Sequence, residues 1–118
     1  MAVSAKNFGK IALVALGVVG MATPIYTMAQ DAPAPLTDAE VTASRALFSQ
    51  YGCSACHAFA DGGGTGHIGP SLDGNASLTV DYVTQTVSNG QGAMPSFGGM
   101  LSEQQLATLA RYIVEKKR

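Results

Sequence analysis

The most constraining feature of this 118-residue chain is the run Cys53-Ser54-Ala55-Cys56-His57. The spacing Cys-x-x-Cys-His is typical of a covalent attachment site for c-type haem. Two thiols separated by two residues can add to the two vinyl groups at one edge of a porphyrin, and the histidine that follows can take an axial position on the iron. Both cysteines of the chain belong to this run. We therefore expect one haem c, bound covalently through Cys53 and Cys56, with His57 as an iron ligand.

Two other chemistries also use closely spaced cysteines. A redox-active Cys-x-x-Cys dithiol normally lies within a thioredoxin-like βαβ pattern, and the sequence around this run has no such pattern. A structural zinc site would need two further ligands at metal-ligand spacing, but only His57 and His67 remain and there is no further cysteine. Haem attachment is the interpretation that uses both cysteines and the histidine that follows them.

The first 29 residues differ from the rest of the chain. Lys6 and Lys10 precede an uncharged, mostly apolar stretch from Ile11 to Ala29, and Thr27-Met28-Ala29 resembles a signal-peptidase site. An uncleaved anchor is the alternative, because about 19 helical residues would span about 28 Å, close to the roughly 30 Å hydrocarbon core of a bilayer. Residues 1–29 are thus predicted to be a signal peptide or a transmembrane anchor. Both predict a location in the periplasm or on the periplasmic face of the inner membrane.

A short spacer and a small acidic domain follow. Residues 30–36, with two prolines and two alanines, predict a fairly stiff spacer, and residues 37–118 are expected to form the haem domain. From Asp31 onward five basic and eight acidic residues give a net charge of −3. The absence of a basic stripe argues against nucleic acid as a partner. We expect redox proteins as partners, and also the membrane if the leader is retained.

Three segments carry the signals of helices. Thr37 and Ser102 each precede Glu or Gln by three residues, the capping-box pattern, and Thr79 is a plausible cap for a helix over Val80–Ser88. The first helix should end near residue 50. Apolar residues recur at helical spacing in all three segments: Val41, Leu47, Phe48 and Tyr51; Tyr82, Val83 and Val87; Leu106, Leu109, Ala110, Ile113 and Val114. No alternating run predicts a strand, so the predicted fold class is all-α.

Residues 58–77 are expected to be a loop. The run Asp61-Gly62-Gly63-Gly64-Thr65-Gly66 predicts a highly flexible backbone. The following Gly69-Pro70-Ser71 predicts a turn, with Leu72 as one buried anchor. His67 lies in a polar, glycine-rich setting, which favours a surface position.

The second axial position on the iron has three candidate ligands after the leader, namely Met94, Met100 and His67. Small residues before Met94 allow the backbone to approach the haem, and Pro95 after it fixes the backbone and removes a donor. Met100 lies two residues before a helix cap, where we expect it to act as a hydrophobic staple. We predict Met94 as the ligand, with Met100, His67 or an open position as alternatives. His/Met ligation raises the potential and leaves no position free for oxygen or peroxide.

The chain from about Leu36 to its end resembles the class I cytochrome c family, in its small bacterial, cytochrome c6/c5/c-553-like form. The matching pieces are Leu47-Phe48, Cys53-Ser54-Ala55-Cys56-His57, Gly69-Pro70-Ser71-Leu72, Met94-Pro95-Ser96-Phe97 and Tyr112-Ile113. The resemblance implies a class I cytochrome c fold, with three or four short helices around one covalent haem. It also implies thioether bonds at Cys53 and Cys56, with His57 and Met94 as axial ligands.

The resemblance implies roles for further residues. The Pro70 carbonyl should accept a hydrogen bond from the imidazole of His57 and so orient the ring. Phe48 and Tyr112 should lie where the first and last helices cross, with Ser44 as their small neighbour. The chain departs from many relatives in having alanine rather than glycine directly after the Cys-x-x-Cys-His run.

The function implied is electron transfer rather than catalysis. The chain would act as an extracytoplasmic carrier of single electrons between redox complexes. The alternative is a membrane-anchored monohaem subunit of a larger respiratory, photosynthetic or dehydrogenase complex. A third interpretation is a haem enzyme or gas sensor whose sixth ligand is weak.

Overall fold

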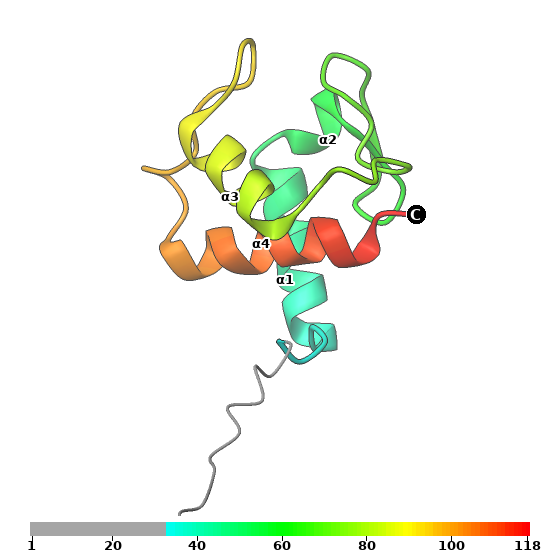
Figure 1. Cartoon of the computed structure of the whole chain (residues 1–118), viewed down its shortest axis with the longest axis vertical. Helices are drawn as coiled ribbons and strands as arrows, with labels where there is room; N and C mark the ends of the chain where they lie inside the picture. The colour runs from blue at the N-terminus through cyan, green and yellow to red at the C-terminus, as the bar shows by residue number, and fades with distance from the viewer. Residues whose placement is uncertain (1–32) are drawn as a thin grey trace, which may run out of the picture. The chain divides into compact units, whose positions relative to one another are not determined.

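Three helices begin at the residues predicted from the sequence (Figure 1). The computed structural model describes residues 33–118. Helix α1 covers Asp38–Gln50, α3 covers Val80–Asn89 and α4 covers Glu103–Lys116. The threonine or serine before each helix accepts a hydrogen bond from a backbone N–H of the first turn, and both predicted capping boxes are present. These bonds satisfy donors that would otherwise lack partners at a helix start.

A short helix and a minimal β-hairpin follow α1. Helix α2 (Cys53–Cys56) starts after Gly52, whose φ of 73° lies in the left-handed region that glycine tolerates. Strands β1 (Ala58–Phe59) and β2 (Gly64–Thr65) then pair antiparallel. The sequence predicts only loop here, because two-residue strands are too short to show an alternating pattern. The fold is nonetheless helical, as predicted.

The centre of the core is aromatic. Helix α4 packs against both α1 and α3 (Figure 1). The ring of Phe59, from β1, meets Phe48 of α1 and Tyr112 of α4 edge to face, with centroid separations of 5.3 and 5.4 Å. These three residues, with Leu109 and Ser44, are the largest fully buried side chains of the described part of the chain. Phe48 and Tyr112 are therefore linked through Phe59 at the helix crossing.

Two apolar side chains lie away from the positions predicted for them. Met100 is 54% exposed, and the residue directly before the cap of α4 is Leu101, which is buried with Leu106. Because a hydrophobic staple uses the residue adjacent to the cap, Leu101 occupies that place and the prediction for Met100 was wrong. Tyr82 is 50% exposed, although its spacing predicts burial with Val83.

The glycine-rich run is closely packed against its neighbours. A Cβ on Gly62 would lie 2.8 Å from the rings of both Phe48 and Phe59. A Cβ on Gly64 would lie 3.2 Å from Phe48, and one on Gly66 would collide with the backbone of α2. The sequence predicts flexibility for this run, but the glycines allow the hairpin to lie directly on α1 and α2.

The end of the spacer is bound to α4. Arg111 donates a hydrogen bond to the Ala34 carbonyl, and the N–H of Leu36 donates to Glu115 Oε2 at 3.3 Å. Leu36 is buried. The predicted leader, residues 1–29, and the first residues of the spacer lie outside the described residues. Within residues 33–118, no helix combines the length and apolar character needed to cross a membrane.

Candidate haem-binding site

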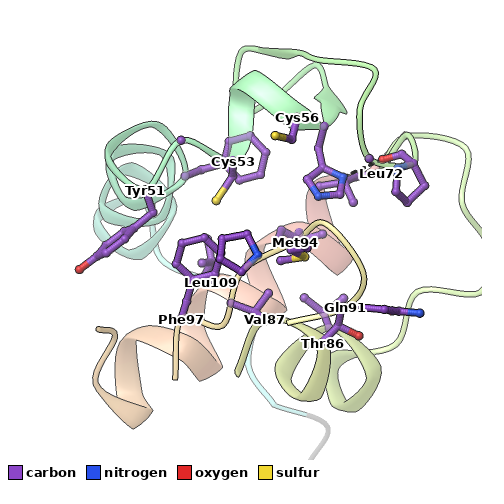
Figure 2. Close-up of a pocket in the computed structure, with 18 of the residues that line it drawn as sticks. Tyr51, Cys53, Cys56, Leu72, Thr86, Val87, Gln91, Met94, Phe97 and Leu109 are labelled. Atoms are coloured by element: carbon purple, nitrogen blue, oxygen red, sulfur yellow. Dashed lines mark hydrogen bonds between the residues drawn. The ribbon is translucent and has the colours of Figure 1, made fainter. Parts of the chain in front are cut away.

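One largely apolar cavity of about 510 Å³ lies against α2, α3 and α4 (Figure 2). Its volume falls within the roughly 300–1,000 Å³ typical of cofactor sites. All five residues that the sequence assigns to the haem line this cavity: Cys53, Cys56, His57, Pro70 and Met94. The remainder of its wall is mostly aliphatic and aromatic, with Val83, Val87, Leu109 and Ile113 contributed by α3 and α4. Residues far apart in the sequence thus meet around one largely apolar cavity.

The two thiols lie on one turn of α2. A separation of three residues places Cys53 and Cys56 on the same helix face, and Figure 2 shows both along one side of the cavity, with Met94 across from them. Neither cysteine is in a disulfide. Burial raises the pKa of the Cys53 thiol. The turn therefore presents both sulfur atoms to one edge of the cavity.

The imidazole of His57 is held in one orientation. Its Nδ1 lies 2.8 Å from the carbonyl oxygen of Pro70. Because a carbonyl can only accept, Nδ1 carries the proton and Nε2 keeps a free lone pair. On the other side, a Cβ built on Gly69 would lie 2.8 Å from Nδ1 and 2.9 Å from Nε2. The ring therefore packs directly on a glycine backbone, with Nε2 as the nitrogen able to bind a metal.

Met94 is placed by a tight turn after α3. The N–H of Gln91 donates to the Met94 carbonyl and the N–H of Met94 donates back to Gln91, both at 3.0 Å. Gly92 within the turn has a φ of 58°, which favours glycine. Met94 is half-buried and packs against the core. The other two candidates, Met100 and His67, are exposed and do not line the cavity.

Sequence reasoning missed two polar residues at the cavity. Tyr82 Oη lies 3.3 Å from Gln91 Oε1, and both side chains line the cavity and are exposed. This contact joins α3 to the turn that carries Met94. Helical spacing alone predicts Tyr82 as a core residue, and nothing local to Gln91 indicates its partner nine residues earlier.

The donor set fits a haem. Two thiols, an imidazole nitrogen with a free lone pair and a thioether surround one apolar cavity, and these are the groups that attach and ligate a c-type haem. A zinc site would require a cluster of further ligands. Within residues 33–118, no three His, Cys, Asp or Glu side chains lie close enough together to hold a metal ion.

Comparison with known proteins agrees with this chemistry. Residues 39–113 match the family described as "Cytochrome C oxidase, cbb3-type, subunit III". The chain belongs to the monohaem cytochrome c family. It is 41% identical over 69 residues to cytochrome c6 of Leptolyngbya boryana, covering 54% of this chain and 79% of that protein. It is 34% identical over 85 residues to cytochrome c6 of Gracilaria tenuistipitata var. liui, covering 66% and 74% respectively.

A solved structure shares the fold. The c-type cytochrome SorU from Sinorhizobium meliloti superposes with a TM-score of 0.60 at 26% identity, over 68% of this chain and 93% of that one. As a cytochrome c, the chain carries one haem c attached covalently through Cys53 and Cys56. It is a cytochrome c6-like electron-transfer protein rather than an enzyme, and its partners are redox proteins.

Proposed function

We propose that the protein carries single electrons between extracytoplasmic redox complexes, with His57 and Met94 as the two axial ligands of its haem. The observation that supports this most strongly is that both side chains line the cavity bordered by the two attachment cysteines. When bound, the haem supplies a one-electron iron couple. The chain's own residues set the environment of this iron couple.

The chain's residues tune and protect that couple. If His57 and Met94 both bind the iron, the Met94 thioether would favour the reduced iron and raise the potential. Small molecules would then find no free coordination site on the iron. With the haem bound, the mostly aliphatic wall from α3 and α4 would limit solvent access and lower the local dielectric. These properties suit electron exchange and disfavour oxygen chemistry.

Replacement of the distal ligand tests this assignment. Met94→Ala should abolish the weak thioether-to-ferric-iron absorption band and allow carbon monoxide to bind the reduced protein. Met100→Ala is the matched control, because Met100 is exposed and lies outside the cavity wall. It should retain the band. The opposite pattern would transfer the ligand role to Met100.

The domain organisation proposed is a leader at residues 1–29, a spacer at 30–36 and the haem domain at 37–118. The apolar leader sequence and the extracytoplasmic chemistry of haem attachment support a location in the periplasm or on the periplasmic face of the inner membrane. An intact mass of the native protein tests this. A soluble protein starting at Gln30 with one haem indicates a diffusible carrier, and a membrane-bound protein that retains the leader indicates a tether.

A second candidate is a fixed, membrane-anchored haem subunit. It is favoured by the match to a family described as an oxidase subunit. It is also compatible with a retained leader. The two candidates differ in oligomeric state. Native protein extracted in mild detergent should elute as a monomer if it is a carrier, and with an oxidoreductase complex if it is a subunit.

A further inference from the structure

The segment on the His57 side of the cavity, residues 69–78, is here called the proximal segment. It supplies the Pro70 carbonyl that holds His57, and it places Leu72 and Leu78 in the cavity wall, each 7% exposed. Its start is fixed to the haem motif. The N–H of Gly69 donates to the Cys56 carbonyl at 2.8 Å, and that of Leu72 donates to the Ala58 carbonyl at 2.9 Å.

Asp73 fixes the middle of the proximal segment. Its Oδ2 accepts a hydrogen bond from the N–H of Ala60 at 2.7 Å, and its Oδ1 accepts one from the N–H of Arg118 at 3.0 Å. Its carbonyl oxygen also accepts from Ser71 Oγ at 2.9 Å. One carboxylate thus joins three parts of the chain: the residue after β1, the proximal segment and the residues after α4. Hydrogen bonds to a charged acceptor are stronger than those between neutral groups.

The residues after α4 fix the far end of the same segment. Lys117 Nζ donates to the carbonyls of Asn75 and Leu78, at 2.8 and 2.9 Å. The N–H of Gly74 donates to the Arg118 carbonyl. These contacts anchor the segment on the residues after α4, and the Asp73 carboxylate connects those residues by hydrogen bonds to Ala60, directly after β1.

We propose that Asp73 is a positioning residue for the axial histidine, acting through the Pro70 carbonyl. Pro70 lies three residues from Asp73 and His57 lies three residues from Ala60, so the carboxylate, together with the backbone bonds of Gly69 and Leu72, holds together the two segments that carry the carbonyl and the imidazole. A hydrogen bond such as that from His57 Nδ1 to the Pro70 carbonyl orients a ligating histidine and raises its basicity. The inference rests on the proposed role of His57 as an iron ligand.

Hydrogen exchange at the imidazole tests the inference. In the reduced, ¹⁵N-labelled full-length holoprotein, the exchange rate of the His57 Nδ1 proton reports directly on its bond to Pro70. Asp73→Ala removes both acceptors and should speed this exchange by about tenfold, since two charge-assisted bonds are lost. Asp73→Asn keeps one carbonyl acceptor and should speed it less. The reduction potential should shift in the same order, because the imidazole loses electron donation.

Controls separate this inference from other effects. Asp38→Ala removes the same charge from an exposed residue of α1 and should leave the exchange rate unchanged. An unaltered Met94 methyl signal would show that the opposite face is intact. Equal effects of Asp73→Asn and Asp73→Ala would indicate a charge effect and overturn the inference, as would no effect of either. If Asp73→Ala fails to fold, the exchange rates of the His57 Nδ1 proton in Asp73→Asn and Asp38→Asn are compared instead, and faster exchange is expected only in Asp73→Asn. A parent protein without a coordinated-histidine signal would instead contradict the proposed function.

Discussion

At the scale of single residues, Gly69 shows how closely the site is packed. An added Cβ would lie within 3 Å of both ring nitrogens of His57, at 2.8 and 2.9 Å. Gly69→Ala should therefore force the imidazole or the backbone to shift and cost about 1–3 kcal/mol of stability, as overpacking does. Gly99→Ala is the matched control, because a Cβ there meets nothing within 4 Å. Denaturant unfolding of the two holoproteins measures the difference, and equal midpoints would contradict the packing.

The Asp61 carboxylate makes the free energy of unfolding depend on pH. Its carboxylate accepts hydrogen bonds from Arg45 Nε and Nη2, at 3.0 and 2.9 Å, and from Tyr112 Oη at 2.7 Å. The bonds from Arg45 in particular hold the pKa of Asp61 below its ordinary value of 3.8. Burial, followed by the bond to Asp61, raises the pKa of Tyr112, so its hydroxyl stays a donor.

The direction of the pH effect follows from linkage. A carboxyl group whose pKa is lowered by folding stabilises the folded state fully at a pH above its pKa in the unfolded chain. This stabilisation is lost as the pH falls through its pKa in the folded state. The free energy of unfolding should therefore fall as the pH is lowered below about 4. Asp61→Asn should be less stable at neutral pH and show a shallower loss on acidification. Asp81→Asn, at an exposed residue of α3, is the charge-matched control. If the free energy of unfolding of Asp61→Asn fell with pH as steeply as that of the parent protein, this role of the Asp61 carboxylate would be refuted.

At the scale of elements, the packing of α1 on α4 depends on a small residue. Ser44 is fully buried on the face of α1 that carries Val41 and Phe48, and its Oγ has no hydrogen-bond partner within the described part of the chain. Because alanine favours helices and removes an unsatisfied hydroxyl, Ser44→Ala should be neutral or stabilise by up to about 1 kcal/mol. Ser44→Leu should destabilise by about 1–3 kcal/mol, since the helices must separate.

The matched control for this prediction lies on the same helix. Ser49→Leu places the same side chain at an exposed position of α1 and should change stability by less than about 0.5 kcal/mol. Thermal unfolding of the three variants measures the contrast. A Ser44→Leu protein as stable as Ser49→Leu would contradict close packing of the two helices.

The elements also show what the sequence can predict. Helix starts are local, so Thr37, Thr79 and Ser102 are enough to predict where the three long helices within residues 33–118 begin. Five of the residues that line the cavity, Cys53, Cys56, His57, Pro70 and Met94, could be assigned from the sequence because each belongs to a short local motif. The bonds of Asp73 to Ala60 and Arg118 join residues 13 and 45 positions apart, and no local pattern encodes such pairs. The close packing of the glycine run was also missed. A glycine in a sequence is equally compatible with a flexible backbone and with a backbone packed closely on its neighbours.

At the scale of the whole molecule, the haem is part of the core. A cavity of about 510 Å³ left empty would cost up to about 12 kcal/mol at roughly 24 cal/mol per Å³. This is an upper bound because the cavity is open to solvent, yet it is comparable to the roughly 5–15 kcal/mol stability of a whole domain. The double variant Cys53→Ala, Cys56→Ala, freed of haem by extraction, should therefore lose cooperative unfolding and much of its helical circular dichroism. A sharp, native-like transition without haem would contradict this.

We propose that His57 and Met94 occupy both axial positions on the iron, so that the protein exchanges electrons but binds no small molecule at the iron. The most direct measurement is the absorption spectrum of the reduced, full-length native protein at neutral pH, with and without carbon monoxide. Ligation by both His57 and Met94 predicts identical spectra. A clear shift of the Soret band on adding carbon monoxide would show a weak or vacant sixth position. That result would contradict closed His/Met ligation and favour a haem enzyme or gas sensor instead.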